Sequence, residues 1–168
     1  MRILDTVAAR ETSLADRLSK KQRSILMSSV RTEHTGPELE VRSVAHRSGY
    51  RFTLHRKDLP GKPDIVFPRF KSVVFVHGCF WHRHKGCSKS SLPATRRDFW
   101  AAKLSRNVIR DTENRCQLRG AGWRVLVIWE CQARERNVVA KKLKRFLDGA
   151  HPERIAALRS RTLSKVLA

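Results

Sequence analysis

The chain of 168 residues carries 36 Lys and Arg against 15 Asp and Glu, which leaves a net charge of +21. Such an excess repels itself unless a polyanion compensates it, so the charge favours nucleic acid as a partner. Hydrophobic residues make up 40% of the chain, enough for the core of one domain, and the longest apolar runs are too short to cross a bilayer.

The first 20 residues alternate between charged and apolar side chains and contain no hydrophobic stretch like that of a secretory signal. We therefore expect a cytoplasmic protein without a membrane partner, in which the four cysteines stay reduced and serve as metal ligands or core residues. Residues 1–18 are expected to form a basic, loosely held arm. A folded domain is expected over residues 19–148, and a basic tail over residues 149–168.

Two helices are predicted in the first third of the chain. The first covers residues 18–30 and precedes a polar connection. The second begins at residue 35 and runs to Gly49, a residue type that commonly ends a helix. Pro37 suits a first helical position, and Glu38 favours the positive N-terminal end of the helix dipole.

Three strands are predicted next. Residues 50–54 alternate between polar and apolar side chains as a strand does. A turn at residues 59–63 leads into a short strand over residues 64–67. Residues 72–77 form a nearly continuous apolar run, as expected for a strand buried on both faces. A hairpin of the last two strands would bring Asp64 close to the end of its neighbour.

The second half of the chain continues the alternation of helices and strands. Residues 97–118 have helical spacing, residues 123–129 form a second buried strand, and residues 137–147 form a final helix. The apolar face of the long helix would carry Trp100, Leu104, Val108 and Leu118. This order of elements predicts an α/β domain with a mixed central sheet.

Residues 79–87 concentrate cysteines and histidines, the ligands that zinc prefers. The local ligands would be Cys79, His84 and Cys87. Cys131, at the end of the last strand, could complete a tetrahedral site, and Cys116 competes for that place although its helical phase sets it apart. The alternative is a set of buried cysteines with incidental histidines.

A second group of polar residues has the types that catalyse phosphodiester hydrolysis. Asp64 begins a strand, where a carboxylate can hold Mg²⁺ against a phosphate. His82 can take a proton from water, or it could be a zinc ligand or a surface histidine. Asn107 and Asp111 lie one helical turn apart, where they could orient such a histidine or form a solvated edge.

Phe80 and Trp81 are two large apolar side chains inside the predicted metal loop of a very basic protein. Aromatic wedges of this kind can be inserted between base pairs to kink and inspect DNA. They could equally pack beneath the zinc. Met27, in a polar context near the end of the first helix, poses the same question.

These motifs, in this order, resemble the very short patch repair (Vsr) endonucleases. Members of this bacterial family have a restriction-endonuclease-like fold and nick beside the thymine of T·G mismatches formed by deamination of 5-methylcytosine. The resemblance extends over about residues 20–148. It rests on Met27 and on residues 35–38, 59–64, 77–82, 93–96, 99–100, 107–111, 122–126 and 129–131.

The resemblance implies a role for each matching residue. Asp64 corresponds to the family's Mg²⁺-binding aspartate and His82 to its catalytic histidine. Glu38 and His77 correspond to supporting residues of the active site, and Asp111 to the partner that orients the histidine.

The resemblance also implies a structural zinc and a DNA wedge. The zinc ligands would be Cys79, His84, Cys87 and Cys131. Met27, Phe80 and Trp81 match the residues that the family inserts beside the mismatch. Val76 stands where the best-known member has Thr at a metal-binding position, and its main-chain carbonyl would survive that change.

The implied substrate is double-stranded DNA with a T·G mismatch, and the implied cofactors are Mg²⁺ for catalysis and structural Zn²⁺. We expect a monomer at the bacterial nucleoid, functionally linked to a cytosine-5 DNA methyltransferase and to mismatch-repair proteins. Two alternatives stay open at this point. One is a restriction-type endonuclease of the same fold that cuts matched DNA, and the other is a zinc-stabilised DNA-binding module without catalysis.

Overall fold

The computed structural model describes residues 21–22, 25, 28 and 33–149. The predicted N-terminal arm, most of the predicted helix over residues 18–30, Met27 and residues 150–168 of the tail lie outside the described residues. The helices are α2 (Gly36–Arg47), α3 (Arg97–Gly120), α4 (Glu130–Ala133) and α5 (Arg136–Asp148), with short 3₁₀ turns at Pro68–Phe70 and Ser88–Ser90. The strands are β1 (Ile65–Phe67), β2 (Ser72–His77) and β3 (Arg124–Trp129).

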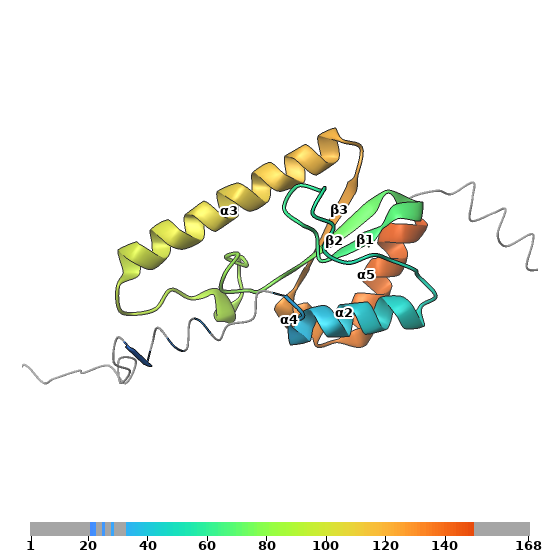
Figure 1. Ribbon diagram of the computed structural model, residues 1–168. Coiled ribbons are helices and arrows are strands. Elements are labelled where there is room, and N and C mark those ends of the chain that lie inside the picture. The colour runs from blue at the N-terminus through green and yellow to red at the C-terminus, as the bar shows by residue number, and fades with distance from the viewer. Residues whose placement is uncertain (1–20, 23–24, 26–27, 29–32, 150–168) are drawn as a thin grey trace, which may run out of the picture.

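The three strands form one sheet in the order β1-β2-β3. β1 pairs with β2 antiparallel, with Ile65 opposite Val74, and β2 pairs with β3 parallel, with Val76 opposite Ile128. Figure 1 shows α3 along one face of this sheet, and α2, α4 and α5 gathered on the other. The arrangement confirms the predicted mixed sheet flanked by helices.

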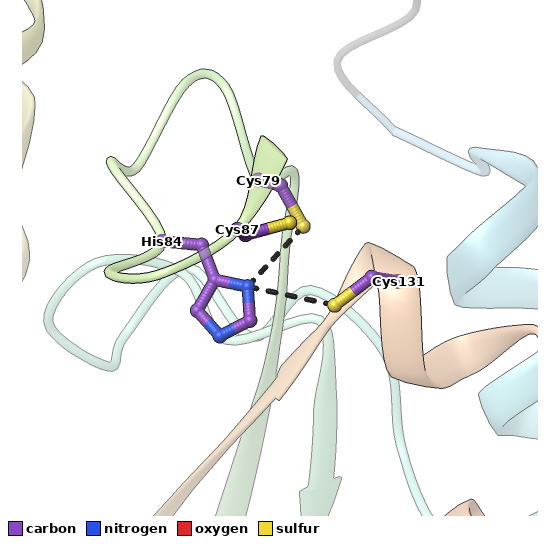
Figure 2. Close-up of side chains that lie close together, drawn as sticks. All are labelled: Cys79, His84, Cys87 and Cys131. Carbon is purple, nitrogen blue, oxygen red and sulfur yellow. Dashed lines mark hydrogen bonds between the residues drawn. The ribbon is translucent and has the colours of Figure 1, made fainter. Parts of the chain in front are cut away.

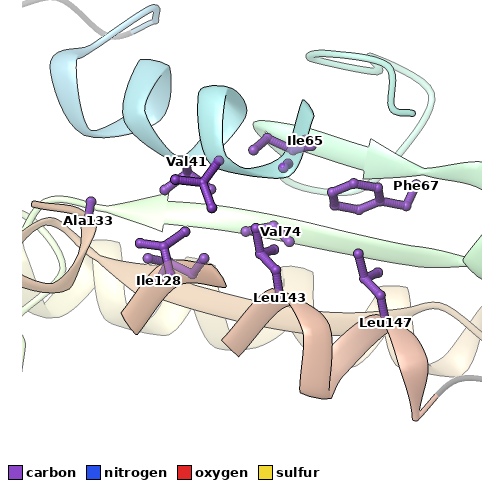
Figure 3. Packing of buried hydrophobic residues seen from close by; sticks show 11 residues of the cluster. Val41, Ile65, Phe67, Val74, Ile128, Ala133, Leu143 and Leu147 are labelled. Atoms are coloured by element: carbon purple, nitrogen blue, oxygen red, sulfur yellow. The ribbon is translucent and has the colours of Figure 1, made fainter. Parts of the chain in front are cut away.

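Each face of the sheet has its own core, because alternate residues of a strand point to opposite sides. On one face, apolar side chains of the strands pack against α2, α4 and α5 (Figure 3). Its fully buried members include Val41, Ile65, Phe67, Val74, Ile128, Leu143 and Leu147. The other face packs beneath the C-terminal part of α3, where Leu118 contacts the cluster of Val66, Val73 and Phe75. The sheet is therefore held rigidly from both sides.

The predicted strand over residues 50–54 is wrong. Only Thr53 pairs, through an isolated bridge to Val66 with two backbone hydrogen bonds of 2.8 and 2.9 Å. The ladder cannot extend, because Pro68 lacks an N–H and His55 turns the chain away with a φ of 47°. Phe52 still packs its ring 5.8 Å from that of Phe67.

Two expectations about burial also differ from the structure. Val108 is 37% exposed, whereas Leu104 and Leu118 are buried. In the middle of α3, the side of the helix that faces the end of the sheet carries the polar residues Asn107 and Asp111 instead of an apolar side chain. The predicted second buried strand, β3, lies at an edge of the described sheet, and only Ile128 in it is fully buried.

Candidate functional site

Asp64 lies one residue before β1, and the hairpin brings it to the neighbouring strand. Its Oδ2 accepts a hydrogen bond of 2.7 Å from the backbone N–H of Val76. Burial raises the pKa of Asp64 to about 6, and the nearby charge of Glu38 adds to this effect. A half-buried carboxylate with so little compensation suits a bound cation.

Glu38 is buried at the N-terminus of α2, where it closes a capping box with Thr35. Its Oε1 accepts a hydrogen bond of 2.9 Å from the Thr35 hydroxyl. Its Oε2 accepts from the backbone N–H of His34 (3.0 Å) and from the guanidinium of Arg42 (2.6 Å). Both oxygens are thus engaged, and the carboxylate lies beside Asp64 and His55, with ligand atoms of the three residues within 4.8 Å of one another.

His77, at the end of β2, and His82, in the following loop, stack with ring centroids 3.8 Å apart. Burial lowers the pKa of His77 to about 3, and the neighbouring His82 lowers it further. His77 therefore stays uncharged at neutral pH. It supports the ring of His82 without placing a positive charge against it.

His82 is oriented from across the cleft by α3. Its Nδ1 lies 2.5 Å from Oδ2 of Asp111. Burial raises the pKa of Asp111, but the hydrogen bond and charge of His82 outweigh burial and hold that pKa below its ordinary value. Because the carboxylate accepts at Nδ1, the Nε2 of a neutral His82 has a free lone pair. Asn107 anchors the same loop by donating to the carbonyl of Trp81 (3.1 Å).

The cysteines and histidine predicted to bind zinc come together at the other end of the loop (Figure 2). Nδ1 of His84 lies 3.6 Å from Sγ of Cys79 and 3.5 Å from Sγ of Cys131. A tetrahedral site with ordinary zinc bond lengths has nitrogen–sulfur edges of about 3.6 Å.

The fourth member of the group is Cys87, and all four ligand atoms lie within 4.8 Å of one another. The donor set therefore fits zinc. Cys131 lies in α4 rather than in the last strand, and the competing Cys116 is exposed. The ring of His84 also stacks on Trp129, with centroids 4.2 Å apart.

Phe80 and Trp81 pack against the start of α3. Their rings contact each other edge to face, with centroids 5.1 Å apart, and Phe80 meets Trp100 at 5.4 Å. Nζ of Lys103 lies over the rings of Trp81 and Trp100, 5.6 Å from each centroid. The rings are partly exposed and sit beside a cation, an arrangement that offers stacking surface to a base.

A cleft of about 760 Å³ joins these groups. The acid and histidine residues in its lining are Glu33, Glu38, His55, Asp64, His77, His82, Asp111 and Glu130. Cations on its walls are Lys62, Lys103, Arg110 and Arg115. This combination of buried acids, an oriented imidazole and basic walls can bind a phosphodiester and hydrolyse it.

Reasoning from sequence did not single out Arg42, His34 or His55. The spacing of Arg42 four residues after Glu38 is the usual signature of a helical ion pair and could have suggested that contact. His55 is 13 residues from Arg42, and its contact arises from the turn before β1. In the part of the chain that the structure describes, no helix is long and apolar enough to span a membrane.

Comparison with known proteins gave a family-model match over residues 15–89, to DNA mismatch endonuclease Vsr. The type II nicking enzyme V.XorIIP of Xanthomonas oryzae pv. oryzae is 49% identical over 135 residues, or 80% of this chain and 98% of that protein. The DNA mismatch endonuclease Vsr of Escherichia coli is 41% identical over 123 residues, or 73% and 78%.

Among solved structures, the catalytic domain of the homing endonuclease I-Bth0305I has a TM-score of 0.50 at 19% identity. The match covers 69% of this chain and 97% of that domain. At that level of identity the likeness concerns the fold. The family-model match over residues 15–89 includes the hairpin and the loop that carry Asp64, His77 and His82.

Proposed function

The chain belongs to the Vsr family of DNA mismatch endonucleases, and from this we propose that it makes a Mg²⁺-dependent nick 5′ to the thymine of a T·G mismatch. Family membership makes it a DNA endonuclease, a hydrolase of the phosphodiester bond. The nick would fall in one strand of the duplex and leave a 3′-hydroxyl and a 5′-phosphate.

Asp64 and the main-chain carbonyl of Val76 are the proposed ligands of Mg²⁺. The carboxylate is half-buried, and among the described residues only the Val76 N–H donates a hydrogen bond to it. A divalent cation would relieve this half-buried charge, so the donor set fits. When bound, Mg²⁺ supplies charge that polarises the phosphate and stabilises the leaving 3′ oxygen.

His82 is the proposed general base. Its Nδ1 is hydrogen-bonded to Asp111, which leaves Nε2 to take the proton of the attacking water. Asp111 would stabilise the imidazolium that results, and the neutral ring of His77 would hold the imidazole in plane. The His82–Asp111 pair beside the half-buried Asp64 is the observation that carries the catalytic proposal.

The loop between β2 and α3 would present the wedge. Zinc at Cys79, His84, Cys87 and Cys131 would brace this loop. Phe80 and Trp81, together with Met27, would be inserted beside the mismatch. A T·G pair unstacks at lower cost than a matched pair, so insertion itself contributes to selectivity.

The substrate also defines the functional partners that we propose. A T·G pair formed by deamination requires 5-methylcytosine, so a cytosine-5 DNA methyltransferase must act earlier on the same site. The nicked product needs further mismatch-repair proteins to restore the pair. We propose that the chain acts as a monomer on nucleoid DNA.

A nicking assay tests this proposal on end-labelled duplexes that differ only in one T·G or matched pair. We expect Mg²⁺-dependent cleavage of the T·G duplex on the thymine strand. Asp64→Asn should abolish it, whereas Asp58→Asn, at an exposed carboxylate paired with Arg56, should not. Equal cleavage of matched DNA would favour a restriction-type enzyme, and binding without any cleavage would favour a DNA-binding module.

A further inference from the structure

Arg42 is a buried guanidinium that no proposed step uses. It is 8% exposed and contacts three groups. Besides Glu38, its Nη1 lies 2.7 Å from Nδ1 of His34, and its Nη2 lies 2.9 Å from Nε2 of His55. One cation thus connects the segment before α2 with the turn before β1.

These contacts determine which nitrogen of His55 carries the proton. Arginine stays protonated in proteins and can only donate hydrogen bonds. Nε2 of His55 must therefore accept from Arg42, which requires a neutral ring with its proton on Nδ1. By the same reasoning, His34 accepts at Nδ1 and carries its proton on Nε2.

The Nδ1–H of His55 has no acceptor among the described residues, and His55 lines the same cleft as Asp64. The local backbone is also held in an unusual conformation. His34, His55 and Lys62 have positive φ, at 55°, 47° and 48° respectively, and Lys62 pairs with Glu33. Of these, His34 and His55 both contact the buried guanidinium of Arg42, which indicates a geometry that the fold maintains at a cost, as functional sites often do.

The tautomer also excludes the most obvious role for His55. Histidine, glutamate and aspartate together could hold a metal ion, and His55, Glu38 and Asp64 are close enough to do so. However, the lone pair of His55 is directed at Arg42, and the other nitrogen bears a proton. The ring can offer the cleft a hydrogen-bond donor but no ligand atom.

We propose that His55 donates a hydrogen bond from Nδ1 to a phosphate oxygen of the bound DNA strand, and that Arg42 is the positioning residue that orients it. The acceptor should be a phosphate oxygen, because Lys62, Lys103, Arg110 and Arg115 line the same cleft and suit a polyanion. The contact is neutral on the protein side and so differs from the lysine and arginine contacts around it. The proposal rests on DNA binding in this cleft, as the proposed function requires.

Isosteric substitutions of His55 test the donor. Gln places its amide near Nε2 and loses the Nδ1 donor, whereas Asn places an N–H near Nδ1. In Mg²⁺-free buffer, His55→Gln should weaken duplex binding about tenfold, and His55→Asn by clearly less. His46→Gln, at an exposed position on α2, is the matched control and should bind as wild type does.

The salt dependence of binding separates this contact from an ionic one. Loss of a cationic contact lowers the slope of log Kd against log salt concentration by about 0.9, whereas loss of a neutral donor leaves it unchanged. With saturating Mg²⁺, His55→Gln should raise KM and leave kcat within about threefold. Unchanged Mg²⁺-free binding, or a reduced salt slope, would overturn the proposal.

A double-mutant cycle tests the role of Arg42. Lysine keeps the charge at position 42 but cannot reach three acceptors at once, so Arg42→Lys should weaken binding as much as His55→Gln does. The double variant should then be no weaker than Arg42→Lys alone, and additive losses would show that Arg42 does not act through His55.

Nitrogen-15 NMR of the wild-type histidines gives a check that needs no variant. We expect a protonated Nδ1 on His55 at neutral pH, and a protonated Nε2 would contradict the proposal. All binding is measured on matched and T·G duplexes, because a backbone contact should contribute equally to both. If the protein showed no preference for T·G duplexes, the effect of His55→Gln on binding to matched DNA would still test the proposed phosphate contact.

Discussion

At the residue scale, the active site is assembled from groups whose charge is controlled by burial. Asp64 keeps a carboxylate in a half-buried position that raises its pKa, and burial keeps the His77 imidazole neutral. Titratable groups in such positions lower the free energy of unfolding of the ligand-free protein, and they are found where a bound ligand compensates that loss. The two residues therefore mark the place where a cation and a phosphate would bind.

Asp64→Asn should stabilise the Mg²⁺-free protein. A pKa of about 6 in the folded state, above the ordinary value of 3.8, means that folding favours the protonated carboxyl. The resulting penalty is absent below pH 4, grows as the pH rises, and is complete above pH 6, where it amounts to roughly 3 kcal/mol.

Thermal melting in Mg²⁺-free buffer measures this effect. The variant should melt a few degrees above wild type at pH 7, and the difference should narrow to about half at pH 5. Asp58→Asn serves as the exposed control and should show no comparable gain. A lower melting temperature for Asp64→Asn would contradict the burial argument.

Asp111→Asn should impair catalysis more than binding. An amide can donate to Nδ1 of His82 and so favour the wrong tautomer, which would place the proton on Nε2. We expect kcat for nicking to fall about 10²- to 10⁴-fold with little change in DNA affinity. Asp98→Asn, at an exposed position on the same helix, should be neutral, and a similar loss there would point to helix damage.

At the element scale, α3 and the β2–α3 loop depend on each other. The loop is tied to α3 through Asn107 and Asp111, and to α4 through the cysteine–histidine group. The 24-residue length of α3 lets Leu118, near its C-terminus, pack on the sheet while cleft residues lie along the helix from Lys103 to Arg115. His82, the proposed general base, is thus positioned by two separate attachments of its loop.

The zinc proposal predicts about one zinc per chain by metal analysis. Cys131→Ser should reduce this content and lower the melting temperature, because the ligand group joins the loop to α4. Cys116→Ser changes an exposed cysteine outside the group and should leave both unchanged. A zinc-free wild-type protein would refute the proposed site.

At the scale of the whole molecule, the net charge of +21 dominates the encounter with DNA. Sequence-independent contacts to phosphates release counterions, so affinity should fall steeply with salt. If the protein contacts six to ten phosphates, affinity should drop about 10³- to 10⁵-fold between roughly 50 and 200 mM salt. Fluorescence anisotropy with matched and T·G duplexes measures both slopes, which should be parallel. A flat slope would mean that the charge does not engage the backbone.

Local patterns in the sequence were sufficient to predict much of the fold. Strand β2, helix α2 and the limits of α3 agree closely with the predictions, because the pattern of apolar residues that marks each of them is local in the sequence. The family and the endonuclease activity also followed from local motifs, and the comparisons confirm them. Most of the cysteine–histidine group that we propose to bind zinc could be recognised in the sequence, because three of its four members lie within nine residues.

The tertiary structure decided the contacts between distant segments. The pairing of His82 with Asp111 spans 29 residues, and the contact of Arg42 with His55 joins a helix to a turn. No local period encodes such contacts, since they depend on how the elements pack. Residues 50–54 show that a local pattern alone does not decide strand pairing. Their alternation is typical of a strand, but Pro68 and the turn at His55 allow only one bridge. Spacing along the chain identifies chemical groups, and packing determines which of them meet.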